Sequence, residues 1–75
     1  MSPQREQIRS VWEQVLGHGD FTDDENFFAV GGHSLLAAQV AARINRVAPA
    51  RVAARDLFDH PTVTALAALI ASRTV

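Results

Sequence analysis

Apolar residues recur at the period of an α-helix in separate stretches of this 75-residue chain. In the first stretch they fall at i, i+3, i+4, i+7 and i+8, which predicts a helix near residues 4–16. These residues are Ile8, Val11, Trp12, Val15 and Leu16. Ser2 and Pro3 are typical of the N-cap and first helical positions, and Gly17 is typical of a helix end. Because Trp12 lies on this stripe, we expect it in the core.

A second stripe predicts a helix from about Ser34 to Arg46. The segment around Pro49 is expected to break this helix, because a residue before proline avoids the α conformation. The expected buried face consists of Ala37, Val40, Ala41, Ile44 and Val47. Leu35 and Ala38 lie on a different side of the helical wheel, so we expect them to be exposed. Arg43 lies at the edge of the stripe, where its charged end can reach solvent.

The remaining pattern predicts a short helix from Ala54 to Phe58 and a last helix from Thr62 to Ala71. Leu57 and Phe58 are the expected anchors of the short helix. Pro61 and Thr62 are typical of a helix start. The stripe of the last helix is Val63, Leu66, Ala67 and Ile70, and residues 72–75 are expected to fray. With no period-two alternation, the chain is predicted to be all-α. We expect residues 1–75 to form a single domain, a small four-helix bundle of three longer helices and one short helix.

The connection between the first two helices, residues 17–33, is long for so small a domain. It contains Phe21, Phe27 and Phe28, of which we expect at least two to plug the core. Its acidic residues do not fit a calcium-binding EF-hand counted from Asp20, because that loop needs Gly at its sixth and Glu at its twelfth position. The sequence has Glu25 and Gly31 there.

The composition narrows the possible functions further. Apolar residues make up 48% of the chain and charged residues 20%, which is typical of a globular domain. The chain has no cysteine, so disulfides and thiolate metal sites are excluded. The net charge is -1 and the basic residues are few and scattered, so we expect no nucleic-acid partner. No apolar run is long enough to span a membrane, and no secretory signal is apparent. We therefore expect a cytoplasmic monomer.

One stretch combines turn-forming residues, a hydroxyl group and a helix start: Gly31-Gly32-His33-Ser34-Leu35. Ser34 is predicted to be the N-cap, where unpaired N–H groups and the helix dipole favour an anion attached to its hydroxyl. A serine hydrolase is not supported, because the nucleophile elbow requires a second Gly and a preceding strand. No pair of histidines has zinc-ligand spacing. Local chemistry leaves two roles open for Ser34, a simple helix cap and an attachment point.

The run from Phe27 to Leu35, Phe-Phe-Ala-Val-Gly-Gly-His-Ser-Leu, resembles the signature of peptidyl carrier (thiolation) domains of non-ribosomal peptide synthetases. The similarity extends over nearly the whole chain and includes the Phe-Asp-His-Pro-Thr-Val segment of residues 58–63. The departures are small. Glu25 replaces a usual Asp, Ala29 a common acid and Val30 a usual Leu.

The resemblance implies that Ser34 receives 4′-phosphopantetheine from coenzyme A through a phosphopantetheinyl transferase. Gly32, His33 and Leu35 flank the attachment site. The thiol of the arm would hold aminoacyl or peptidyl groups as thioesters and deliver them to adenylation, condensation and thioesterase-type release domains. The carrier itself would catalyse nothing. Leu35 and Ala38, next to the serine, are the expected partner surface.

Two alternatives remain open. The first is an acyl carrier protein of a polyketide or fatty-acid pathway, although such proteins usually have Asp-Ser-Leu at the serine and are more acidic. The second is a helical docking module that is never modified.

Overall fold

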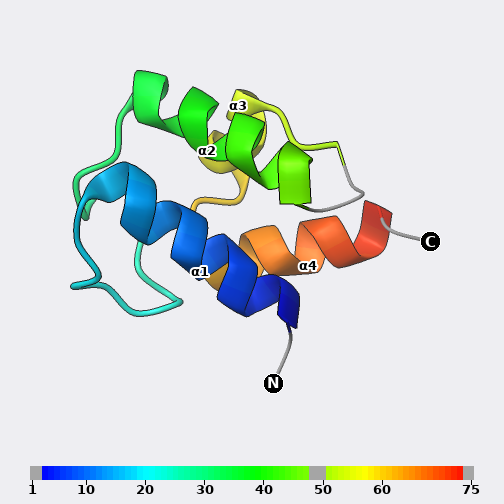
Figure 1. Ribbon diagram of the computed structural model, residues 1–75, viewed down its shortest axis with the longest axis horizontal. Helices are drawn as coiled ribbons and strands as arrows, with labels where there is room; N and C mark the ends of the chain where they lie inside the picture. The colour runs from blue at the N-terminus through cyan, green and yellow to red at the C-terminus, as the bar shows by residue number, and fades with distance from the viewer. Residues whose placement is uncertain (1–2, 48–50, 74–75) are drawn as a thin grey trace.

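The computed structural model describes residues 3–47 and 51–73, and within them it contains four α-helices and no strand. In chain order these are α1 (Pro3–Leu16), α2 (Ser34–Val47), α3 (Ala54–Asp59) and α4 (Val63–Arg73). The all-α prediction of three longer helices and one short helix is confirmed. Helix α1 packs against both α2 and α4, and α3 packs against α2 (Figure 1).

Local chemistry explains where these helices begin and end. Helix α1 ends at Leu16 and is followed by Gly17, whose φ of 81° favours glycine and whose N–H donates to the Glu13 carbonyl at 2.9 Å. Thr62 is the N-cap of α4, because its Oγ1 accepts a hydrogen bond from the Ala65 N–H at 3.0 Å. The predicted cap at Ser2 and the predicted break around Pro49 lie outside the described residues.

The C-terminal end of α4 differs from the prediction. We expected fraying from Ser72, but the helix continues through Arg73. Its end is held because the Arg73 guanidinium donates to the Asp56 carboxylate at 2.8 Å and to the Arg51 carbonyl at 2.6 Å. Residues 74–75 lie outside the described part of the chain.

The predicted stripes meet in one core. Its largest fully buried side chains are Trp12, Val40, Ile44, Leu57, Val63, Leu66 and Ile70 together with Phe27 from the long loop. The expected core position of Trp12 is confirmed. At the C-terminal end of the α1 stripe, Val15 and Leu16 are only partly buried and pack against this core. The core therefore joins the helices to the long loop that precedes α2.

Two apolar residues that we expected to be buried are exposed. Val47 is 53% exposed because it is the last residue of α2 and borders exposed polar residues of α1, including Gln7. Phe58 is 52% exposed because α3 is short and turns its neighbour Leu57 inward. The Phe58 ring instead stacks on Phe28, with 4.7 Å between ring centroids.

Candidate functional site

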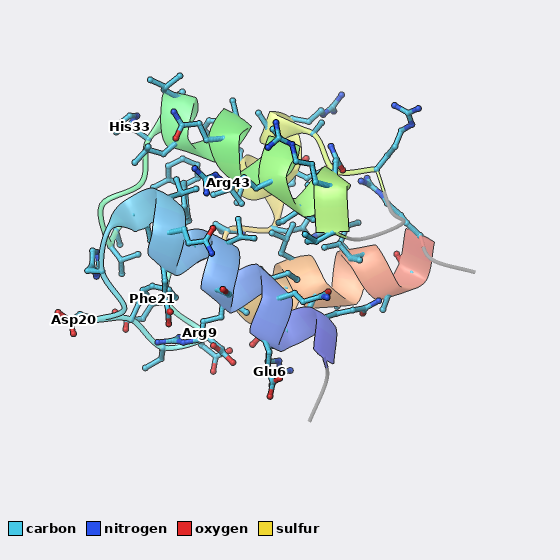
Figure 2. All side chains as sticks on the ribbon, viewed as in Figure 1. Glu6, Arg9, Asp20, Phe21, His33 and Arg43 are labelled. Carbon is cyan, nitrogen blue, oxygen red and sulfur yellow. The ribbon has the colours of Figure 1, made fainter. Side chains whose placement is uncertain are left out.

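The long loop of residues 17–33 is anchored by aromatic rings that pack on α1. The Phe27 ring meets Trp12 edge-on at 4.9 Å between centroids, and the Phe21 centroid lies 5.7 Å from that of Trp12. Phe21 and Phe27 are buried, which confirms that at least two loop phenylalanines plug the core. On the outside, the Arg9 guanidinium covers Phe21 at 4.3 Å, on the loop side of α1 (Figure 2).

Polar contacts close this loop at its base. His18 donates from Nε2 to the Val30 carbonyl at 2.7 Å, and its Nδ1 accepts from the Asp20 N–H at 3.0 Å. Arg9 ties the outer part of the loop to α1 through Asp23 at 3.2 Å. The loop therefore holds a defined conformation although it contains no regular secondary structure.

A tight turn after Asn26 leads the chain toward α2. The side-chain oxygen of Asn26 accepts a hydrogen bond from the Phe28 N–H at 2.8 Å. The backbone carbonyl of Asn26 accepts one from the Ala29 N–H at 2.9 Å. Both the N–H and the carbonyl of Phe27 form hydrogen bonds that fix this turn. Its N–H donates to the Pro61 carbonyl at 2.6 Å, and its carbonyl accepts from the Gly32 N–H at 2.9 Å.

The two glycines of the motif are required for different reasons. Gly31 has a φ of 119°, a conformation that other residues rarely adopt. Gly32 has no such φ, but a Cβ atom at this position would overlap two carbons of the Phe27 ring and lie 2.7 Å from the Phe27 carbonyl oxygen. The absence of a side chain at Gly32 thus lets the protein's own aromatic core approach this backbone closely.

Ser34 is the first residue of α2, and its side chain is exposed. The His33 carbonyl accepts the first intrahelical hydrogen bond, from the Ala37 N–H at 2.8 Å. The N-cap is therefore His33 and the predicted cap role of Ser34 is wrong, because α2 begins one residue earlier than a serine cap requires. The hydroxyl still lies in the first turn, where free N–H groups and the helix dipole favour an anion.

The residues that follow Ser34 form an exposed apolar edge. Leu35 is 64% exposed and Ala38 is also exposed, as expected, whereas Leu36 packs partly against the core. His33 is exposed beside the serine. The hydroxyl is thus open to a large partner and does not lie in an enclosed catalytic pocket.

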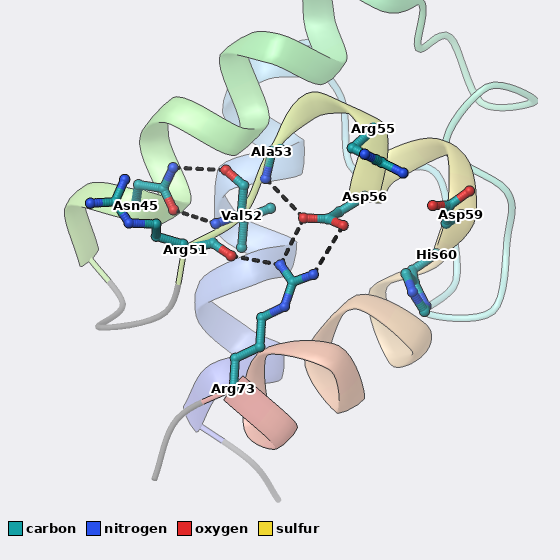
Figure 3. A pocket seen from close by; sticks show the side chains of 9 residues that line it. All are labelled: Asn45, Arg51, Val52, Ala53, Arg55, Asp56, Asp59, His60 and Arg73. Carbon is teal, nitrogen blue, oxygen red and sulfur yellow. Dashed lines mark hydrogen bonds and ion pairs between the residues drawn. The ribbon is translucent and has the colours of Figure 1, made fainter.

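A concavity of about 480 Å³ lies away from Ser34, between α3 and the C-terminal ends of α2 and α4 (Figure 3). Several of its polar groups bind one another. Asp56 accepts from Arg73 at 2.8 Å and from the Ala53 N–H at 2.9 Å, while Asn45 exchanges two hydrogen bonds of 2.8 Å with Val52. The Arg73 hydrogen bond holds the pKa of the Asp56 carboxyl below its ordinary value of 3.8, although burial acts to raise it. This site joins three helices and is a structural clamp.

Other kinds of site find no support in residues 3–47 and 51–73. No group of three or more His, Cys, Asp or Glu side chains is arranged to hold a metal ion there. None of the helices in the same ranges has the length and apolar character needed to cross a bilayer. Ser34 and its surroundings are therefore the strongest candidate site.

Known proteins are similar to this chain in both sequence and fold. Residues 6–70 match the family described as "Phosphopantetheine attachment site". Tyrocidine synthase 2 of Brevibacillus parabrevis is 42% identical over 65 residues, which cover 87% of this chain but only 2% of that protein. The dimodular nonribosomal peptide synthase of Bacillus subtilis (strain 168) is 45% identical over 67 residues, 89% of this chain and 3% of that protein.

Among solved structures, a peptidyl carrier protein in complex with the phosphopantetheine transferase Sfp and coenzyme A superposes with a TM-score of 0.89 at 36% identity. The match covers 97% of this chain and 95% of that one. These similarities extend over the helices, the long loop and the serine turn, so the chain belongs to the phosphopantetheine attachment site family and is a peptidyl carrier domain of the non-ribosomal peptide synthetase type.

Proposed function

We propose that Ser34 is the residue on which this carrier domain receives 4′-phosphopantetheine. The observation that supports the proposal is the position of an exposed serine at the first residue of α2, held there by the Phe27–Gly32 packing. The first-turn N–H groups and the helix dipole favour the phosphodiester by about 0.3–1 kcal/mol. The residues present therefore fit the group.

The covalent step is a transfer from coenzyme A. The Ser34 oxygen forms a bond to the phosphorus next to the pantetheine part, the pyrophosphate link breaks, and the nucleotide part leaves. The hydroxyl proton passes to a base on the transferase. That enzyme can reach the hydroxyl because His33 and Ser34 are both exposed. When attached, the arm supplies a thiol that holds an acyl group as a thioester. The protein contributes position and access, and no catalysis of its own.

Intact-mass spectrometry tests the assignment. The apo chain is incubated with coenzyme A and a promiscuous phosphopantetheinyl transferase, and we expect a gain of one phosphopantetheinyl group. Ser34→Ala should fold normally and gain nothing. Ser10→Ala, an exposed serine on α1, is the matched control and should load like the parent chain. A mass gain that persists in Ser34→Ala, or that is lost in Ser10→Ala, would place the site elsewhere.

We further propose that the cargo is aminoacyl or peptidyl, and that adenylation, condensation and thioesterase-type domains exchange it with this carrier. One solved neighbour supports the adenylation partner, an adenylation and carrier pair with phenylalanyl-adenylate at 30% identity and a TM-score of 0.85. The exposed Leu35 and Ala38 are the proposed docking edge, with Gly32 and His33 completing the motif that the transferase meets. The domain is proposed to span residues 1–75 and to act as a monomer in the cytoplasm.

A further inference from the structure

A groove of about 330 Å³ lies between α1 and the C-terminal half of α2, away from the serine. Its floor is the buried Val11, and Val47 forms an exposed apolar wall. Arg43 and Arg46 line the α2 side, and both are exposed. Arg43 reaches across to α1 and donates to Gln14 Oε1 at 3.0 Å.

The charged residues that line this groove are all positive and all come from α2. The α1 residues that line it, Gln7, Ser10 and Gln14, are all uncharged. The acidic Glu13 does not line the groove and pairs instead with Arg9 at 3.2 Å. Helix α2 itself contains no acidic residue. The two groove arginines thus face amides and one apolar side chain, with no carboxylate among the lining residues.

This combination favours one kind of occupant. Two cations attract carboxylates and steer their approach, while Val47 and the recess above Val11 offer a place for one apolar side chain. We propose that this groove docks an acidic segment of a partner protein, with carboxylates on Arg43 and Arg46 and an apolar side chain against Val47. The contact is small, so the complex is transient.

The position of the groove allows simultaneous use of both ends of α2. Ser34 and Arg46 are twelve residues apart, about 18 Å along a helix with a rise of 1.5 Å per residue. A segment bound in the groove therefore leaves the serine accessible. Such a contact keeps the carrier near a partner while the serine end remains free. The inference does not depend on modification of Ser34, and Ser34→Ala should bind the segment as the parent chain does.

The test uses a synthetic peptide with blocked ends, Asp-Glu-Glu-Leu-Leu-Glu-Asp, titrated into the 15N-labelled chain at low salt. We expect NMR shifts concentrated on the groove residues, above all Gln14, Arg43 and Val47. The double substitution Arg43→Gln and Arg46→Gln should weaken binding about tenfold or more. Val47→Ser should weaken it less. Because all three side chains are exposed, the variants should keep the fold, which their NMR spectra report directly.

Two controls make the result decisive. Arg55→Gln removes an exposed arginine of α3 outside the groove and should leave binding unchanged. A peptide with Gln and Asn in place of Glu and Asp should bind much more weakly. Equal binding of the neutral peptide, shifts centred on another surface, or unchanged affinity in the double variant would overturn the proposal. A dimer in sedimentation that the double variant abolishes would also overturn it, by assigning the groove to a second copy.

Discussion

Gly32→Ala should destabilise this protein through the core and not through the turn. Gly32 shows no left-handed φ, so alanine is compatible with its backbone. The added Cβ, however, would overlap the edge of the Phe27 ring and crowd the Phe27 carbonyl oxygen. That ring cannot withdraw easily, because it is fully buried and lies edge-on to Trp12 at 4.9 Å and to Phe28 at 5.2 Å.

The expected cost follows from overpacking a closed core. Inserting one carbon into such a site destabilises by about 1–3 kcal/mol. In a domain of this size, about 2 kcal/mol lowers the midpoint of thermal unfolding by roughly 8–16 °C. The strain lies two residues from Ser34, so the proposed loading of Ser34 by a phosphopantetheinyl transferase should also slow.

Urea unfolding followed by Trp12 fluorescence measures this free energy. Gly19→Ala is the matched control, since the nearest neighbour of a Cβ there is the flexible Glu13 carboxylate at 3.3 Å, and its effect should stay within about 0.5 kcal/mol. A double-mutant cycle with Phe27→Leu isolates the ring. Removing the ring edge should make Gly32→Ala cost less than it does in the parent chain.

Two outcomes would refute the reasoning. If Gly32→Ala were as mild as Gly19→Ala, the ring would not occupy the space that the structure assigns to it. If Gly32→Ala cost the same with and without Phe27→Leu, the cost would come from the turn backbone. Gly32 would then serve the turn and not the core.

Three further predictions concern the clamp, a helix cap and the docking edge. The Arg73 hydrogen bond lowers the pKa of Asp56 in the folded state. The stabilisation by this bond is therefore fully present above the pKa that Asp56 has in the unfolded chain, and it is lost as the pH falls through the pKa that Asp56 has in the folded protein. Stability should therefore fall below about pH 4, and Asp56→Asn, compared by thermal unfolding from pH 2 to 7, should show a smaller fall from a lower plateau; identical profiles would contradict this. Thr62→Ala should cost about 1 kcal/mol in urea unfolding, and Thr62→Ser should retain most of the stability; equal losses would mean that the hydroxyl is not the cap. Leu35→Asp should leave the unfolding midpoint unchanged, because Leu35 is 64% exposed, but should slow the proposed loading of Ser34 or transfer from a partner; normal rates in both assays would remove Leu35 from the proposed docking edge.

The helices and most of the core could be predicted because each depends on local periodicity. The stripe from Val63 to Ile70 is buried as predicted, and so is Trp12. The same reasoning was wrong at Val47, because periodicity identifies a face of a helix and does not show where the neighbouring helix stops covering it. Phe58 was misplaced for a related reason, since a six-residue helix buries only part of one face.

Contacts between distant residues could not be predicted from sequence. The His18–Val30 hydrogen bond depends on the path of the whole loop, and no spacing rule connects these two residues. The clamp of Asp56 and Arg73 spans 17 residues. The sequence contains one part of this arrangement. Asp56 lies three residues after Ala53, and an acid at that spacing can accept a hydrogen bond from the N–H of the residue that precedes the helix, here Ala53. Ala53 cannot complete that capping box with its own side chain, so the sequence contains only half of the pattern.

The stiffness of the serine turn and the openness of the serine are consequences of the same contacts. Between Asn26 and Gly32, hydrogen bonds and a buried ring fix the backbone, while the side chains of His33, Ser34 and Leu35 remain exposed. Because a prosthetic arm would itself span the distance to a partner, a mobile serine would bring no advantage. A mobile serine would instead leave the proposed docking edge less well defined. The two ends of α2 favour anions for different reasons. The first turn does so through its N–H groups, and the C-terminal half does so through Arg43 and Arg46. If one partner contacts both ends, its affinity should decrease steeply with salt, and the arginine double variant should lose part of that dependence while loading of Ser34 is unchanged.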